Sequence, residues 1–280
     1  MKTKIDAKRI VSEDNLNIYY WINSPSKFEK SRGFFFLHPA SSMNHSSLEK
    51  LENKLIDDGF STIILDPRGV GLSDKPFMSS DYNLELFSSD IRKVLEQEGV
   101  EKPMYFTHSM GFMPVVDYVY KTNNAEQIFG SGSSHKFKES SPNRLLFWLF
   151  DKYIRKFEVV MQSSIKKRKG ISQYNDLSNA TTEIDLYEAI CDVPEEEIEA
   201  HIVSGRKINT WGISYQLSEI NIPIHLIYGN KDEMVRYKKT APHIKDVSGG
   251  IVTLDLVAGG KHALPLFQPK KVVEIMQKYI

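Results

Sequence analysis

Three residues of this sequence have side chains that together could make an activated nucleophile: Ser109, Asp232 and His262. A serine hydroxyl is a poor nucleophile at neutral pH, so a neutral imidazole must accept its proton during attack on a carbonyl carbon. A carboxylate that accepts the other ring N–H fixes the tautomer of the histidine and stabilises the imidazolium that forms. This chemistry requires that the fold bring the three side chains together, and therefore depends on the elements that precede them.

The elements around the serine are predicted by the stretch 104–112. Residues 104–108 are an apolar, β-branched and aromatic run typical of a strand, and residues 113–120 carry apolar groups at helical spacing. A serine at the sharp turn between strand and helix is held in a strained backbone conformation, which exposes its hydroxyl at the C-terminal end of the strand. Gly111 lets the helix pass close to the strand.

The carboxylate and the histidine also follow predicted strands. Asp232 comes shortly after a strand at residues 222–229, and His262 follows a last strand at residues 251–256. The carboxyl ends of parallel strands open on one rim of an open α/β sheet, so we expect the three side chains to meet there. Glu233 is an alternative to Asp232 as the carboxylate.

Two motifs resemble those of the α/β-hydrolase family. The turn at 107–111 resembles its nucleophile elbow, Gly-x-Ser-x-Gly, with Thr107 at the first glycine position, where a β-branched side chain crowds the turn. The loop Asp66-Pro67-Arg68-Gly69-Val70-Gly71-Leu72-Ser73 resembles the Asp-x-Arg-Gly-x-Gly-x-Ser loop found after the fourth strand in many members, where it is structural. The chain order serine, aspartate, histidine is the one that this resemblance implies. His108 is predicted to pack beside the elbow rather than react.

The resemblance also implies two backbone amides for the oxyanion of an acyl-transfer reaction, which needs preorganised donors. The first is Met110 N–H, at the N-terminus of the helix. The second is Ala40 N–H, in a loop at 38–42 that resembles the family's His-Gly-x-x signature with Pro39 in the glycine position. Proline has no N–H, so Pro39 itself cannot donate. His38 is predicted to hold this loop by hydrogen bonds.

The order of the predicted elements indicates the fold class. Up to about residue 135, strands alternate with helices, which predicts a mostly parallel, doubly wound α/β sheet. The resemblance implies the α/β-hydrolase fold, with about eight strands. Residues 136–218 instead follow a helical pattern that is too long for a loop. We predict a core domain of residues 1–135 and 219–280 and a helical cap at residues 136–218, which the resemblance places over the site.

The composition argues against several classes of partner. The 280 residues include 36 basic and 36 acidic ones, so nothing suggests a nucleic-acid partner or an anionic membrane. No apolar run approaches the roughly 20 residues that span a bilayer. The first residues lack the apolar core of a signal peptide, and we expect a cytoplasmic protein. The single Cys191 excludes an internal disulfide and a cysteine metal cluster. No metal site or cofactor is expected.

These observations predict a serine hydrolase for a small-molecule substrate, namely a carboxylic ester, lactone or amide with a largely apolar acyl group of small to medium size. Serine rather than aspartate at position 109 argues against the haloalkane dehalogenase and epoxide hydrolase branches. An aminopeptidase, a carbon–carbon bond hydrolase and a haloperoxidase-like perhydrolase remain alternatives; the aminopeptidase is disfavoured because its His-Gly-Gly-Pro-Gly loop is absent. A ligand-sensing protein without turnover is also left open, as is the oligomeric state.

Overall fold

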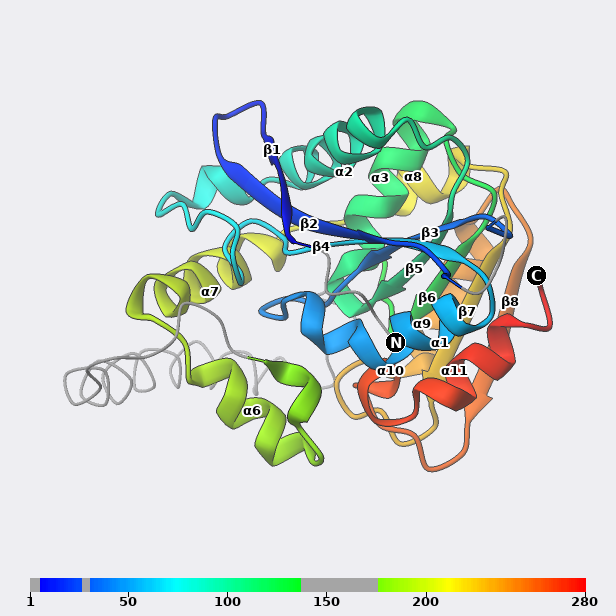
Figure 1. The fold of residues 1–280 in the computed structure, drawn as a ribbon. Helices are drawn as coiled ribbons and strands as arrows, with labels where there is room; N and C mark the ends of the chain where they lie inside the picture. Colours follow the sequence, from blue (N-terminus) through cyan, green and yellow to red (C-terminus); the bar gives the residue numbers. More distant parts are fainter. Residues whose placement is uncertain (1–5, 27–30, 137–175) are drawn as a thin grey trace.

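A central eight-stranded sheet organises the protein in the computed structural model, which describes residues 6–26, 31–136 and 176–280 (Figure 1). The strand order is β1-β2-β4-β3-β5-β6-β7-β8. β2 pairs antiparallel with β1 and β4, and every other neighbouring pair is parallel. The predicted mostly parallel sheet is therefore confirmed. The strands are Lys8–Val11 (β1), Asn17–Asn23 (β2), Phe34–His38 (β3), Ser61–Leu65 (β4), Met104–His108 (β5), Ile128–Ser131 (β6), Ile224–Gly229 (β7) and Val252–Val257 (β8).

Helices cover both faces of this sheet. One layer contains α2, α3, α8 and α9, and the opposite layer contains α1, α10 and α11 (Figure 1). Within the described ranges, no helix is both long and apolar enough to cross a bilayer. The helices are Glu49–Asp57 (α1), Leu84–Glu98 (α2), Phe112–Thr122 (α3), Glu183–Cys191 (α6), Glu195–Ile208 (α7), Ser214–Glu219 (α8), Tyr237–Val247 (α9), Leu264–Phe267 (α10) and Pro269–Met276 (α11), with 3-10 turns at His45–Leu48 (η1), Ser79–Tyr82 (η2), Ser109–Gly111 (η3) and Leu177–Asn179 (η4).

The central strands are buried on both faces because their apolar side chains alternate between the two layers. Phe35 and Leu37 of β3 belong to the cluster under α1 and α11, whereas Phe36 belongs to the cluster under α2 and α3. Tyr105 and Phe106 of β5 divide in the same way. Successive side chains of a strand point to opposite faces, so an unbroken apolar run is what a strand between two helical layers requires.

The sequence also predicts helices at residues 46–59, 83–98 and 269–280, and the structure confirms each with small changes at its ends. The helix predicted at residues 46–59 divides into η1 and α1, and Gly59 follows its end with φ +95°, a left-handed conformation that glycine adopts without strain. The helix predicted from residue 83 begins one residue later as α2, and the closing helix predicted for residues 269–280 ends at Met276.

The predicted cap at residues 136–218 lies partly outside the described residues. The sequence has two aromatic runs in this segment, at 144–150 and 153–157, and a basic cluster at 166–169; all three lie outside the described residues. The described part, residues 176–218, contains η4, α6, α7 and α8. Of these, α8 packs against α3 and α9 in a layer of the core. The boundaries of the cap stay a prediction.

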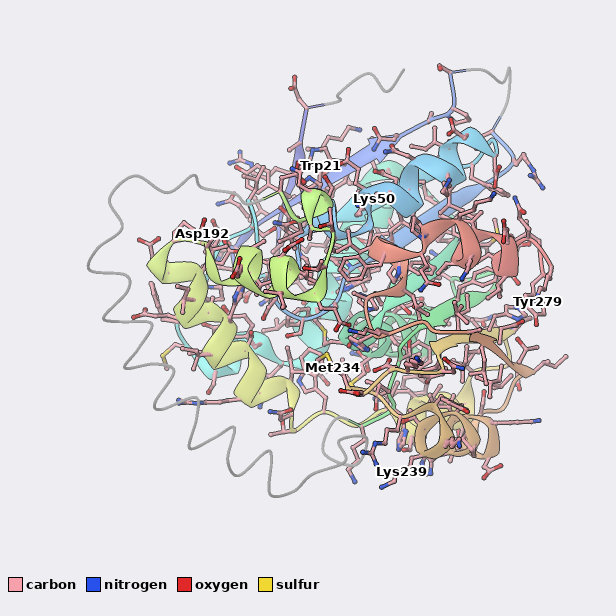
Figure 2. The ribbon with its side chains drawn as sticks, turned by 90° about the horizontal axis from the view of Figure 1, so that it is seen from below. Trp21, Lys50, Asp192, Met234, Lys239 and Tyr279 are labelled. Carbon is pink, nitrogen blue, oxygen red and sulfur yellow. The ribbon has the colours of Figure 1, made fainter. Side chains whose placement is uncertain are left out.

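The two ends of β7 face different surroundings. His225, its second residue, stacks on Tyr279 with ring centroids 4.0 Å apart. The loop after the strand carries Asp232 and then the exposed Met234. Figure 2 shows the labelled residues Tyr279 and Met234 well apart. The Asp232 loop therefore lies at the carboxyl end of the sheet, away from the chain's C-terminal residues.

The loop after β4 is organised by the fully buried Arg68. Its guanidinium donates two hydrogen bonds to the carboxylate of Asp90, at 2.8 and 2.9 Å, and two to Asp14, at 2.7 and 3.1 Å. A further bond of 2.8 Å reaches the carbonyl of Asp81. Arg68 thereby joins the β1–β2 turn, η2 and α2 to the loop. The structural role that the motif implied for this loop agrees with these contacts.

Replacing Arg68 by Met should lower the free energy of unfolding by about 3–5 kcal/mol, because the almost fully buried Asp90 would lose its countercharge. Arg92→Met is the matched control. This arginine of α2 pairs with Glu96 and Glu13 at the surface, and its loss should cost at most about 1 kcal/mol. Urea unfolding of both variants measures the difference. Equal midpoints would mean that the buried network does not stabilise the fold.

Candidate active site

Ser109 lies at the turn between β5 and the helix pair η3 and α3. Its φ is +52°, a left-handed value that is strained for a residue with a side chain. A Cβ added to Gly111 would lie 2.6 Å from both His38 Nδ1 and the carbonyl oxygen of Pro39, so only glycine fits where the turn passes the 38–42 loop. Thr107 is accommodated inside β5, where its hydroxyl donates to the carbonyl of Phe129 at 3.2 Å.

His262 and Asp232 are in direct contact. The ring Nδ1 of His262 lies 2.8 Å from Asp232 Oδ2, and both residues are buried. The other carboxylate oxygen accepts the backbone N–H groups of Met234 and Val235 at 2.9 and 2.8 Å. Because the carboxylate accepts, Nδ1 carries the proton of a neutral imidazole and Nε2 carries the lone pair. Glu233 is exposed, so the carboxylate that contacts His262 is Asp232.

Two glycines let the backbone approach this pair. Gly132, just after β6, has φ +58°, and a Cβ there would lie 3.0 Å from His262 Nδ1 and 3.5 Å from Asp232 Oδ2. At the end of β7, a Cβ on Gly229 would lie 2.1 Å from the carbonyl oxygen of Gly260. The sequence did not predict a role for Gly132; its only signal was a glycine directly after a strand.

The serine is linked to His262 through its neighbour in the chain. His108 Nε2 lies 3.1 Å from the carbonyl oxygen of His262, and the two rings are 5.0 Å apart. No hydrogen bond between Ser109 and His262 is found among the described residues. The structure therefore brings Asp232 and His262 into contact, and joins the turn that carries Ser109 to the His262 loop through His108.

The two amides predicted to bind an oxyanion belong to Ala40, in the loop after β3, and to Met110, in η3. Pro39 is joined through its carbonyl to His38 Nδ1 at 2.9 Å, which fits the predicted role of His38 in holding this loop. The amide of Ala40 donates no backbone hydrogen bond among the described residues, and Ala40 is buried. Met110 is the second residue of η3, where the first amides of a helix have no acceptor within the helix. Buried N–H groups are rarely left unpaired, so the role of these two amides is taken up with the proposed function.

A small apolar cluster packs part of the predicted cap onto two loops of the site. Ala40 and Met43 of the first loop, Leu177, Ala180 and Leu186 of the cap, and Ala263 and Leu266 after His262 share this cluster. The N–H of Leu177 also donates to Ser46 Oγ at 2.8 Å. Residues 177–186 therefore contact both the Ala40 loop and the His262 loop.

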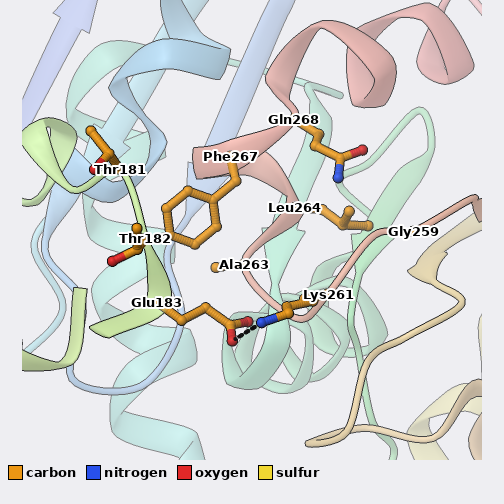
Figure 3. A pocket seen from close by; sticks show the side chains of 9 residues that line it. All are labelled: Thr181, Thr182, Glu183, Gly259, Lys261, Ala263, Leu264, Phe267 and Gln268. Carbon is orange, nitrogen blue, oxygen red and sulfur yellow. Dashed lines mark hydrogen bonds and ion pairs between the residues drawn. The ribbon is translucent and has the colours of Figure 1, made fainter. Parts of the chain in front are cut away.

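Figure 3 shows a pocket of about 230 Å³ beside the His262 loop. The ring of Phe267 forms an apolar wall, and the ion pair between Lys261 and Glu183, at 2.8 Å, crosses from the core to α6. None of Ser109, Asp232 and His262 lines the pocket, although its lining includes the residues on either side of His262. It is lined by Thr181, Thr182, Glu183, Gly259, Lys261, Ala263, Leu264, Phe267 and Gln268.

A sequence comparison identifies the family. The family described as serine aminopeptidase, S33, matches residues 37–267. This chain belongs to the S33 serine aminopeptidase family. The match spans the loops that carry Ala40, Ser109, Asp232 and His262, so this S33 member contains all of its candidate site within the matched region. No curated protein matches the sequence.

Solved structures show the fold of this S33 member. An esterase from Exiguobacterium antarcticum has a TM-score of 0.76 at 17% identity, covering 98% of this chain and 99% of that chain. A bromoperoxidase from Bacillus anthracis has a TM-score of 0.76 at 18% identity, with the same coverage. An epoxide hydrolase from Bacillus megaterium has a TM-score of 0.69 at 16% identity, covering 97% and 99%. These identities show the fold alone, and the predicted α/β-hydrolase fold is confirmed.

Acid should destabilise the protein through its buried histidines. Burial lowers the pKa of His38 to about 4, whereas an unfolded histidine titrates near 6.5. Below pH 6.5 the unfolded chain therefore binds more protons than the folded one, and stability falls as the pH falls towards 4, by about 2 kcal/mol at pH 5 for this residue. His38→Asn keeps a donor near the Nδ1 position but does not titrate.

Urea unfolding at pH 7.5 and pH 5 tests this prediction. The loss of stability between the two pH values should be smaller in His38→Asn than in the wild type, by about 2 kcal/mol. The measurement at pH 7.5 separates this effect from any loss caused by the substitution itself. An unchanged pH dependence would show that His38 takes up a proton in the folded protein as readily as in the unfolded chain.

Proposed function

We propose that this protein is a serine hydrolase that cleaves a carboxylic ester through an acyl-enzyme intermediate. The observation that carries the proposal is the 2.8 Å contact between His262 and Asp232, at the same rim of the sheet as the strained Ser109. Ser109 is the nucleophile, His262 the general base and acid, and Asp232 the group that orients His262. The S33 family match, which includes all three positions, supports the proposal.

The reaction follows from the protonation states. Ser109 Oγ attacks the ester carbonyl carbon while His262 Nε2 takes its proton, and the imidazolium is stabilised by Asp232. The tetrahedral intermediate collapses as the C–O bond to the leaving group breaks, and His262 returns the proton to the departing alcohol. Water then attacks the acyl-serine ester, again giving its proton to His262. The acid is released and Ser109 regains its proton.

The oxyanion of each tetrahedral intermediate is proposed to bind the amides of Ala40 and Met110. Ala40 N–H donates no backbone hydrogen bond among the described residues, and Met110 N–H follows the nucleophile in the first turn of η3. The Pro39 carbonyl and the Ala40 N–H belong to one trans peptide bond and point in opposite directions. The contact of this carbonyl with His38 therefore also fixes the direction of the Ala40 N–H. Loss of one such donor typically slows the reaction about 100- to 1000-fold.

The substrate is proposed to be a small to medium ester or lactone with a largely apolar acyl group. The apolar cluster packs against the Ala40 and His262 loops, and the pocket lies beside the His262 loop, which supports an apolar substrate. An aminopeptidase is the second candidate, because the matching family carries that description. It is disfavoured because the loop 38–42 lacks the His-Gly-Gly-Pro-Gly pattern. Hydrolysis of p-nitrophenyl esters against aminoacyl p-nitroanilides distinguishes the two.

Replacing Ser109 by Ala should abolish reaction with a fluorophosphonate probe and lower kcat for p-nitrophenyl esters by at least about 10⁴-fold, because the nucleophile is gone. Ser131→Ala is the matched control: this serine is also buried at a strand end, and its hydroxyl makes no hydrogen bond within the described structure. It should still react with the probe. Labelling that persists in Ser109→Ala would identify a different nucleophile, and a folded wild type that never reacts would favour a ligand-binding role.

Asp232→Asn should lower kcat by about 10⁴-fold with little change in stability, because an amide cannot hold His262 in the required tautomer. Glu233→Gln, at the next position, changes an exposed carboxylate and should leave kcat within about twofold of the wild type. Steady-state kinetics of both variants on one ester makes the comparison. A large loss in Glu233→Gln together with an active Asp232→Asn would reverse the assignment of the acid.

A further inference from the structure

His108 makes a contact that the proposed reaction does not use. Its Nε2 lies 3.1 Å from the carbonyl oxygen of His262, and since a carbonyl can only accept, Nε2 is the donor. The same oxygen accepts the N–H of Leu264 at 2.8 Å. The His262 backbone is therefore held by one bond from within its own turn and one from the strand end before Ser109.

This bond joins two backbones that must keep a fixed separation. Ser109 follows His108 directly in the chain, and the ring of His262 extends from the residue whose carbonyl His108 binds. We propose that His108 is a positioning residue that sets the distance between the Ser109 hydroxyl and the His262 ring. The role rests on the proposed function, because it concerns the transfer of a proton between these two groups.

The surroundings of His108 suit such a role. The ring is buried, and its Nδ1 has no hydrogen-bond partner in the described part of the chain. Burial lowers the pKa of His108 to about 3, with a further contribution from His262, so the ring stays neutral. A neutral ring keeps its Nε2 proton for the carbonyl. It also adds no positive charge 5.0 Å from the ring that must become an imidazolium.

The bond should matter for rate rather than for substrate binding. A displacement of about 1 Å between reacting groups can slow catalysis about 100-fold. A side chain that fills the same space without donating would let the His262 loop shift, whereas one that donates from a similar position would hold it. This difference separates a positioning residue from one that only fills the core.

The test compares His108→Phe, which has a ring but no donor, with His108→Gln, whose amide N–H₂ can reach the position of Nε2. His225→Phe is the control, since it removes a buried histidine bonded to Gln127 and Thr253 at the other end of the sheet. For each variant, kcat and KM for one p-nitrophenyl ester, the rate of fluorophosphonate labelling, the Tm and the NMR shift of the His262 ring are measured.

In His108→Phe we expect kcat and the labelling rate to fall 10- to 100-fold with KM unchanged, and the His262 resonance to move. His108→Gln should stay within about threefold of the wild-type rates, with the resonance in place. His225→Phe should lower only the Tm. Wild-type rates and an unmoved resonance in His108→Phe would overturn the proposal, as would equal losses in Phe and Gln variants. A wild type that neither hydrolyses the ester nor reacts with the probe would contradict the proposed function. The NMR shift of the His262 ring in His108→Phe would then test the positioning role by itself.

Discussion

The hydrogen bond between His262 Nδ1 and Asp232 is the contact on which the candidate site depends. It exists because β7 and β8 are parallel neighbours, with Gly229 paired to Val257, so the loops after the two strands emerge side by side. Glycines at 132 and 229 leave room for those loops to approach. The carboxylate accepts one ring N–H and two backbone N–H groups, which fixes the direction in which His262 presents its second nitrogen.

The described part of the predicted cap is joined to the same loops and to the loop after β4. Leu177 and its neighbours pack on the Ala40 and His262 loops. Lys261, which directly precedes His262, forms an ion pair with Glu183. Further along, the buried Glu197 of α7 accepts the N–H of Gly71 at 3.1 Å. These contacts connect the segment 177–197 to three loops at the carboxyl rim of the sheet. A change in this segment would therefore reach the site through packing and hydrogen bonds.

Much of the fold was predictable because its signals are local. The apolar runs of β3, β4 and β5 predict strands covered on both faces. The motifs at 66–73 and 107–111 predict the α/β-hydrolase family, to which the matched S33 family belongs. Long-range contacts were not predictable: nothing near Arg68 in the sequence indicates Asp14 and Asp90, and the bond from His108 to the carbonyl of His262 joins residues 154 positions apart. The roles of the five candidate site residues remain proposals.

Mass spectrometry of the protein during turnover tests the proposed chemistry most directly. The wild type is mixed with an excess of p-nitrophenyl butyrate, quenched with acid within the first turnovers and digested. Catalysis through an acyl-enzyme predicts a butyryl group on the peptide that contains Ser109, in an amount equal to the initial burst of p-nitrophenol. Turnover with no acylated peptide, or with the acyl group on another residue, would contradict it.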